Sequence, residues 1–194
     1  MAEWRLFQDG EIPIYTTPEW YLDRERAPHL EQDLHRGRLL QSARLVAEAA
    51  MAHRFRTVVD LGAGDGGLLS LLGPGLTGWG YDLCPSNVAA AKERGVDVRL
   101  GNVLDGPIQW GDIAVATEML EHIVDPHGFV RTVFDNSRVL VASSPWNETP
   151  ESHYEFHAWA WDTTGYRELM EQAGWVVRNH ARVSMFQVLM AVKP

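Results

Sequence analysis

Cysteine and lysine are scarce in this chain of 194 residues. Cys84, the single cysteine, excludes an internal disulfide and any zinc site built on several thiolates, and we expect it to be a packing residue. Lys92 and Lys193 are the two lysines, and 26 acidic side chains against 17 basic ones give a formal net charge of −9. Nucleic-acid affinity rests mostly on basic side chains, so this balance disfavours a nucleic-acid partner, although a local basic patch is still allowed.

Long apolar runs, internal repeats, low-complexity tracts and Pro/Gly/Ser-rich linkers are also missing. No run approaches the roughly 18 apolar residues of a membrane-spanning helix, and the first residues lack the order typical of a signal peptide. A reducing compartment fits the cysteine count, so we expect a cytoplasmic protein. The composition, 45% hydrophobic and 22% charged, is typical of one globular domain and excludes disorder for most of the chain.

Strands and helices alternate after residue 55. Short apolar runs predict five parallel strands, at residues 57–61, 78–83, 96–100, 113–117 and 138–143. Helical spacing or helix-start chemistry predicts helices at residues 66–72, 85–94, 126–134 and 163–173. Two further strands, 175–179 and 184–192, leave no room for a crossover helix and must pair antiparallel. The sequence therefore predicts an α/β fold, a seven-stranded and mostly parallel sheet with a C-terminal antiparallel hairpin and helices on both faces.

A glycine loop follows the first strand. The run V-V-D-L-G-A-G-D-G-G at residues 58–67 is a buried strand, a glycine turn and a helix start. Its glycines satisfy G-x-G-x-x-G, and Asp82 ends the next strand, so a dinucleotide site stays open. Asp60 lies two residues before the first glycine. A loop that binds a pyrophosphate would gain nothing from a negative charge at this position, so Asp60 favours a cationic ligand.

In this loop the chain resembles the class I S-adenosylmethionine-dependent methyltransferases, whose first motif, D-x-G-x-G-x-G, is matched from Asp60 to Gly66. The resemblance covers about residues 55–194 and implies a Rossmann-like core with S-adenosylmethionine as cofactor. An acid at the end of the second strand would bind both ribose hydroxyls, because a carboxylate offers two acceptors to a diol. The implied contacts are Asp60, Gly62, Ala63 and Gly64 for methionine, Asp82 for ribose, and Leu83, Asn102 and Val103 for adenine. The family often has an acid where this chain has Asn102, and an amide oxygen can accept the same hydrogen bond.

The segment E-M-L-E-H follows the fourth strand at residues 118–122. If it is helical, Glu118, Glu121 and His122 share one face. The run resembles ubiquinone-biosynthesis O-methyltransferases and small-RNA 3′-terminal ribose 2′-O-methyltransferases, two groups associated with a divalent cation. This resemblance implies a site for Mg²⁺ or another divalent cation on Glu118, Glu121, His122 and His153, with His157 as the open alternative to His153. The same run occurs without metal, where His122 would take the substrate proton and Glu118 would contact cofactor or substrate.

Residues 1–54 form the N-terminal helical segment, with a break at residues 27–28 that starts a new helix. We expect this segment to be a lid over the core of residues 55–194, because such a site must exclude water and admit substrate. Tyr15, Trp20 and Tyr21 are candidates to line the lid, and Arg36 or Arg38 to meet the cofactor carboxylate.

Taken together, these features favour an S-adenosylmethionine-dependent methyltransferase that O-methylates a small-molecule acceptor, with His122 and Glu118 as catalytic residues. Three alternatives remain: an RNA-end ribose 2′-O-methyltransferase, a cofactor-binding regulatory protein without catalysis, and a dinucleotide-binding oxidoreductase. The acidic charge counts against the RNA enzyme. Oligomeric state and the identity of the acceptor are not encoded in any of these patterns.

Overall fold

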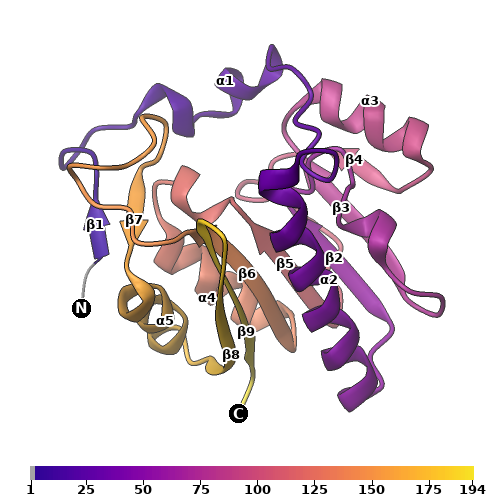
Figure 1. The fold of residues 1–194 in the computed structure, drawn as a ribbon. Helices are drawn as coiled ribbons and strands as arrows, with labels where there is room; N and C mark the ends of the chain where they lie inside the picture. Colours follow the sequence, from indigo (N-terminus) through magenta and orange to yellow (C-terminus); the bar gives the residue numbers. More distant parts are fainter. Residues whose placement is uncertain (1–2) are drawn as a thin grey trace.

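The computed structural model describes residues 3–194 and contains a seven-stranded sheet with helices on both faces (Figure 1). In chain order the strands of this sheet are β2 (Thr57–Leu61), β3 (Thr77–Asp82), β4 (Val98–Leu100), β5 (Ile113–Thr117), β6 (Val139–Pro145), β8 (Val176–Val183) and β9 (Phe186–Val192). Their spatial order is β4-β3-β2-β5-β6-β9-β8. Strands β2 to β6 pair in parallel and β9 pairs antiparallel with both β6 and β8, which confirms the predicted sheet and hairpin.

Both faces of the sheet are buried, which explains why the central strands are continuous apolar runs. The α-helices are α1 (Pro18–Leu22), α2 (Asp33–His53), α3 (Pro85–Arg94), α4 (Pro126–Asn136) and α5 (Thr163–Gln172). Successive side chains of a strand point to opposite faces, so Ala114 and Ala116 of β5 pack with α4 and α5, while Val115 packs with α2. None of the helices in the described part of the chain is long and apolar enough to cross a membrane.

One predicted helix is shorter than expected, and the helix considered for residues 118–122 does not form. The stretch 66–72 contains only a 3-10 turn at Leu69–Leu71, because Gly66 has φ of 73° and Pro74 follows closely. The segment 118–122 is not an α-helix either, and only Leu120–His122 forms a 3-10 turn. Glu118 has φ of 53°, and its N–H donates to the carbonyl oxygen of Ser143, so it continues the pairing of β5 with β6.

The N-terminal segment also differs from its prediction. No helix begins at residues 27–28, and α2 begins at Asp33. Because α2 packs on the sheet through Leu45, Val46 and Ala49, it belongs to the same core as the strands. Only the stretch before α2 crosses the carboxyl ends of the strands, as the indigo part of the chain in Figure 1 shows.

A second, two-stranded sheet anchors the start of this stretch. Strand β1 (Glu3–Arg5) pairs antiparallel with β7 (Trp159–Trp161), and the Glu3 carboxylate accepts a 2.8 Å hydrogen bond from Nε1 of Trp161. The sequence did not predict this pair, because an alternating strand pattern cannot be recognised in only three residues. The crossing stretch is therefore fixed at both ends, by β1 and by α2.

Gly80 in β3 provides a packing prediction. A Cβ at this buried position would lie 2.5 Å from the Cβ of Ala63 and 3.0 Å from the carbonyl oxygen of Asp60. We expect Gly80→Ala to lower the free energy of unfolding by about 1–3 kcal/mol through overpacking. Urea unfolding measures this loss. Gly73→Ala is the matched control, because its Cβ would meet no atom of residues 3–194 within 4 Å, and equal stability of the two variants would contradict the packing.

Candidate active site

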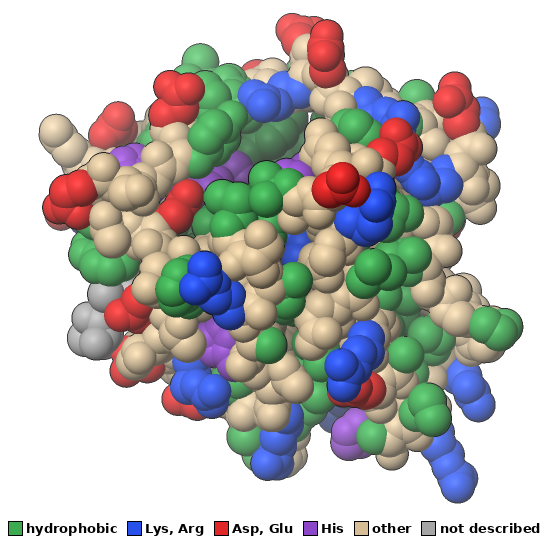
Figure 2. Space-filling model, viewed as in Figure 1, with side chains coloured by type: hydrophobic (Ala, Val, Ile, Leu, Met, Phe, Trp, Pro, Cys, Tyr) green, Lys and Arg blue, Asp and Glu red, His purple; other side chains and the backbone are tan. Residues whose placement is uncertain are grey.

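A cavity of about 600 Å³ opens at the carboxyl ends of β2, β3, β5 and β6. It lies beside β2, where the strand order reverses, which is the place where open α/β sheets bind ligands. Figure 2 shows the hollow in the upper part of the molecule, with histidine and apolar side chains along it. Its volume is in the range of cavities that hold small molecules.

The glycine loop after β2 forms one wall of this cavity. Gly62 and Gly64 have φ of 77° and 56°, a backbone conformation that side-chain-bearing residues rarely adopt. The N–H groups of Gly62 and Ala63 both donate to the carbonyl oxygen of Tyr81, which holds the loop against the end of β3. All the loop residues that the sequence singled out, Asp60, Gly62, Ala63 and Gly64, line the cavity.

Asp60 is a buried carboxylate at the end of β2. Its side chain is 2% exposed, and its Oδ1 atom has no hydrogen-bond partner within the described residues. Burial and the nearby charge of Asp82 raise the pKa of Asp60 to about 7, although Arg38 opposes the shift. A cationic ligand group beside this carboxylate would offset the cost of its burial.

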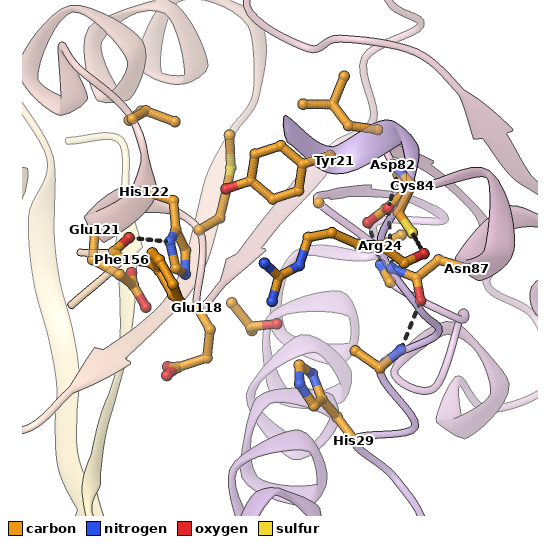
Figure 3. Close-up of a pocket in the computed structure, with 18 of the residues that line it drawn as sticks. Tyr21, Arg24, His29, Asp82, Cys84, Asn87, Glu118, Glu121, His122 and Phe156 are labelled. Atoms are coloured by element: carbon orange, nitrogen blue, oxygen red, sulfur yellow. Dashed lines mark hydrogen bonds between the residues drawn. The ribbon is translucent and has the colours of Figure 1, made fainter. Parts of the chain in front are cut away.

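Asp82 ends β3 and also faces the cavity (Figure 3). Its carboxylate accepts hydrogen bonds from the N–H groups of Gly64 and Cys84 and from Nδ2 of Asn87. Burial raises its pKa, and these hydrogen bonds oppose the shift. The candidate adenine contacts Leu83, Asn102 and Val103 line the same end of the cavity. The Asn102 side chain is engaged locally, since its oxygen accepts from the N–H of Leu104.

The acidic residues of the E-M-L-E-H segment lie at the other end of the cavity. The Glu118 carboxylate accepts a 2.8 Å hydrogen bond from the hydroxyl of Ser143, and burial raises its pKa. Glu121 is fully buried, and neither of its carboxylate oxygens has a partner in the chain from residue 3 onward. Burial and the charge of Glu118 raise the pKa of Glu121 well above its ordinary value.

His122 is held in one tautomer. Its Nδ1 atom lies 3.0 Å from the carbonyl oxygen of Phe156, which can only accept, so Nδ1 carries the proton and Nε2 keeps a lone pair. Burial and the neighbouring His157 lower the pKa of His122 to about 3. The imidazole is therefore neutral at physiological pH and can act as a ligand or an acceptor through Nε2.

The structure brings His157 to this end of the cavity rather than His153. Ligand atoms of Glu121, His122 and His157 all lie within 4.8 Å of one another, while Glu118 is outside this cluster. His157 Nδ1 lies 2.6 Å from the Glu148 carboxylate, which leaves its Nε2 free. His153 is exposed, and its ring bonds to the carbonyl oxygen of Thr149 instead.

No pattern in the sequence distinguishes Glu148. The residue lies in the irregular stretch after β6, and only the folding back of residues 156–158 onto the E-M-L-E-H segment brings it near His157. Two hydrogen bonds fix that fold: the N–H of Ala158 donates to the carbonyl oxygen of Glu121, and Nδ1 of the His122 side chain donates to the carbonyl oxygen of Phe156. No local sequence pattern indicates either contact. The spacing of residues along the chain therefore could not decide between His153 and His157.

The segment before α2 covers the cavity with aromatic side chains. Trp20 and Tyr21 line it, as the sequence predicted, and Tyr15 packs on Phe156 with ring centroids 5.9 Å apart. The segment is tied down at Ala27, whose N–H donates to Oδ1 of Asn87, and at Arg26, which bonds to the Asp65 carboxylate.

Neither candidate arginine, Arg36 or Arg38, is among the described residues that line the cavity. Arg36 bonds to the carbonyl oxygens of Leu30 and Glu31, and Arg38 is fully buried below the cavity with Nη2 3.0 Å from Nδ1 of His29. Arg24 lines the cavity instead. Its place depends on the path of an irregular segment, which no sequence pattern fixes.

Comparisons with known sequences agree with this geometry. Residues 29–187 match the family model described as "Methyltransferase domain". The chain is 38% identical over 86 residues to a ubiquinone biosynthesis O-methyltransferase of Methylobacterium nodulans, a match that covers 39% of this chain and 34% of that protein. It is 41% identical over 76 residues to a trans-aconitate 2-methyltransferase of Mycolicibacterium gilvum, covering 37% and 29%. The chain thus spans about a third of the length of the curated relatives it matches.

Solved structures show the same fold. Magnesium protoporphyrin IX methyltransferase from Synechocystis PCC 6803 with bound S-adenosylhomocysteine has a TM-score of 0.68 at 13% identity, over 91% of this chain and 92% of that one. An S-adenosylmethionine-dependent methyltransferase from Clostridium acetobutylicum has a TM-score of 0.62 at 11% identity, over 84% and 93%. The family model covers more than half of the chain, which therefore belongs to the methyltransferase domain family and is a class I S-adenosylmethionine-dependent methyltransferase domain.

Proposed function

We propose that this domain transfers the methyl group of S-adenosylmethionine to a hydroxyl oxygen of a small-molecule acceptor. The observation that carries the proposal is that one cavity joins Asp60 and Asp82, after β2 and β3, to Glu121 and His122, after β5. When bound, S-adenosylmethionine supplies a methyl group to which the acceptor oxygen bonds, while the sulfur keeps the electron pair of the broken S–C bond. The similarity to an O-methyltransferase supports oxygen as the accepting atom.

The residues at the β2 and β3 ends fit this cofactor. Asp60 offers an unpartnered, buried carboxylate oxygen to an ammonium group. Asp82 presents a carboxylate to the cavity, and two such oxygens match a vicinal diol. An added Cβ at Gly64 would meet no atom of the described chain within 4 Å, so the missing side chain leaves open space beside the loop. Leu83, Asn102 and Val103 would then contact the adenine.

His122 is placed to receive the acceptor proton. Phe156 fixes its Nδ1–H, so Nε2 is the atom that can accept a proton as the hydroxyl oxygen attacks. Nε2 cannot receive this proton and bind a metal ion at the same time. The metal site described next is therefore an alternative to this route, in which a bound ion would lower the pKa of the hydroxyl without His122 as the base. Glu118 holds its hydrogen bond to Ser143 and contributes negative charge at the same end of the cavity.

Glu121, His122 and His157 fit a divalent metal ion. The carboxylate of Glu121 has no hydrogen-bond partner among the described residues. Each histidine donates its Nδ1–H to an acceptor: His122 to the carbonyl oxygen of Phe156, and His157 to the carboxylate of Glu148. Such acceptors behind ligating histidines orient the ring and raise its basicity. Two imidazoles with one carboxylate suit Zn²⁺ or Mn²⁺ better than Mg²⁺, which prefers oxygen ligands. We place His157 in this set instead of His153.

Residues 6–32, the stretch between β1 and α2, form the lid in this proposal. Arg26 and Arg94 both bond to the buried carboxylate of Asp65 in the glycine loop. Asn87 joins the lid to the β3 end, because its Oδ1 accepts from Ala27 while its Nδ2 donates to Asp82. Closing a lid of this kind excludes water from the reacting groups.

Cofactor binding tests the role of Asp82. We expect Asp82→Ala to weaken S-adenosylhomocysteine binding by about 10- to 100-fold, because two charge-assisted hydrogen bonds to the ribose are lost. Isothermal titration calorimetry measures the change, and urea unfolding confirms that the variant is folded. Glu93→Ala, an exposed acid on α3, is the control. Wild-type affinity in Asp82→Ala, or no binding by the wild type, would overturn the proposal.

The raised pKa of Asp60 predicts a pH-dependent stability. Such an acid stabilises the fold below its unfolded pKa of 3.8, and this contribution is lost as the pH rises through about 7. We expect the unfolding free energy of the wild type to fall between about pH 4 and about pH 7.5. The fall should be smaller in Asp60→Asn, and the difference between the two falls should be about 2–4 kcal/mol. Urea unfolding at both pH values measures this, with the exposed Glu93→Gln as control. Parallel behaviour of Asp60→Asn and the wild type would contradict it.

Metal binding distinguishes the two histidines of the loop after β6. We expect calorimetric titration with Zn²⁺ or Mn²⁺ to show one saturable site whose affinity falls at least about tenfold in His157→Ala, since a ligand is removed. His153→Ala is the matched control in the same loop and should bind as the wild type does. A loss in His153→Ala, or the absence of a saturable site, would refute the proposed ligand set.

A further inference from the structure

An aromatic wall extends the cavity beyond His122. It is formed by Trp20 and Tyr21 from the lid and by Tyr154 and Phe156 from the loop after β6, all of which line the cavity. The ring centroids of Trp20 and Phe156 are 5.0 Å apart, and those of Tyr154 and Phe156 are 5.2 Å apart. Neither the cofactor contacts nor the metal ligands use these side chains, so the wall offers flat apolar faces to another molecule.

Arg24 lies at this wall. Its guanidinium carbon is 3.8 Å from the ring centroid of Trp20 and 5.9 Å from that of Phe156. Figure 3 shows the guanidinium in the space between His122 and Asp82. A guanidinium stacked on a ring keeps its N–H fork free for a planar, bidentate partner.

Within residues 3–194 this guanidinium has no ion-pair partner, unlike those of neighbouring arginines. Arg26 and Arg94 bond to Asp65, and Arg36 bonds to Asp33. Arg24 forms no ion pair with any carboxylate of residues 3–194. A positive charge that faces a cavity and has no protein partner there suits an anionic ligand group.

Two carboxylates could meet Arg24: that of the methionine part of the cofactor and that of an acceptor. The guanidinium of Arg24 packs on Trp20, and its carbon lies 5.9 Å from the ring centroid of Phe156, the residue whose carbonyl oxygen bonds to His122. Arg24 therefore belongs with the reacting end of the cavity, and the acceptor is the favoured source.

We propose that the acceptor is a planar hydroxy acid whose carboxylate pairs with Arg24 while its flat body lies against Trp20 and Phe156. The inference rests on the proposed methyl transfer and names its substrate class. The pairing holds the acceptor by one end and directs its hydroxyl toward His122, which receives the proton as in the proposed reaction. A neutral analogue would leave the guanidinium without its partner and would bind less tightly.

A matched pair of ligands tests this. With S-adenosylhomocysteine at saturation, calorimetry compares 4-hydroxybenzoate with 4-hydroxybenzamide, which has the same shape and no charge. We expect the wild type to bind the acid at least about tenfold more tightly than the amide, as a charge-assisted pair does relative to a neutral one. Arg24→Gln should remove this preference, and Trp20→Leu should weaken both ligands alike. Arg44→Gln, an exposed arginine on α2, is the control and should keep the preference.

Separate titration with S-adenosylhomocysteine identifies the source of the carboxylate. We expect the dissociation constant of S-adenosylhomocysteine to differ by less than about twofold between Arg24→Gln and the wild type. Such a difference is smaller than the loss of one hydrogen bond would cause. A tenfold loss there, with the acid preference kept, would assign Arg24 to the cofactor and overturn the inference. Equal binding of the acid and the amide, or binding of neither at millimolar concentration, would overturn it too. Failure of the wild type to bind S-adenosylhomocysteine would instead sink the proposed function.

Discussion

Buried negative charge at the carboxyl ends of β2 and β5 is the constraint on which the site depends. Asp60 and Glu121 keep carboxylate oxygens that accept no hydrogen bond within the part of the chain that the structure describes. Burial of an unpaired carboxylate is costly, and the raised pKa values of both groups express that cost. Groups with such perturbed pKa values are concentrated at sites where a ligand binds or a reaction occurs. Asp60 and Glu121 therefore identify the two ends of the cavity as functional positions.

Arg38 is the counter-charge that makes this arrangement tolerable. It is fully buried on α2, and its charge acts on Glu118, Glu121 and Asp60. One guanidinium against three carboxylates leaves an excess of negative charge, which an ammonium group can relieve at Asp60 and a metal ion or a proton can relieve at Glu121. Because α2 packs on the sheet, the position of Arg38 is fixed by the same core that fixes the strand ends.

Local patterns predicted the parts of the site that belong to strand ends. The glycine loop and Asp82 follow strands whose apolar runs are continuous, and strand order then places them together. Arg24, Glu148 and the choice of His157 over His153 depend on irregular segments that fold back over the sheet, where contacts join residues far apart in sequence. The helical arrangement considered for residues 118–122 does not form for a related reason: Glu118 stays bonded to β6, and only Leu120–His122 forms a 3-10 turn.

A crystal structure of the domain with S-adenosylhomocysteine tests the central claim most directly, because it locates each ligand group against each buried carboxylate. The account predicts the amine beside Asp60, the ribose hydroxyls on Asp82, and the sulfur directed toward the end of the cavity that contains Glu121 and His122. A nucleoside bound outside this cavity, or bound in it with the ribose away from Asp82, would contradict the account.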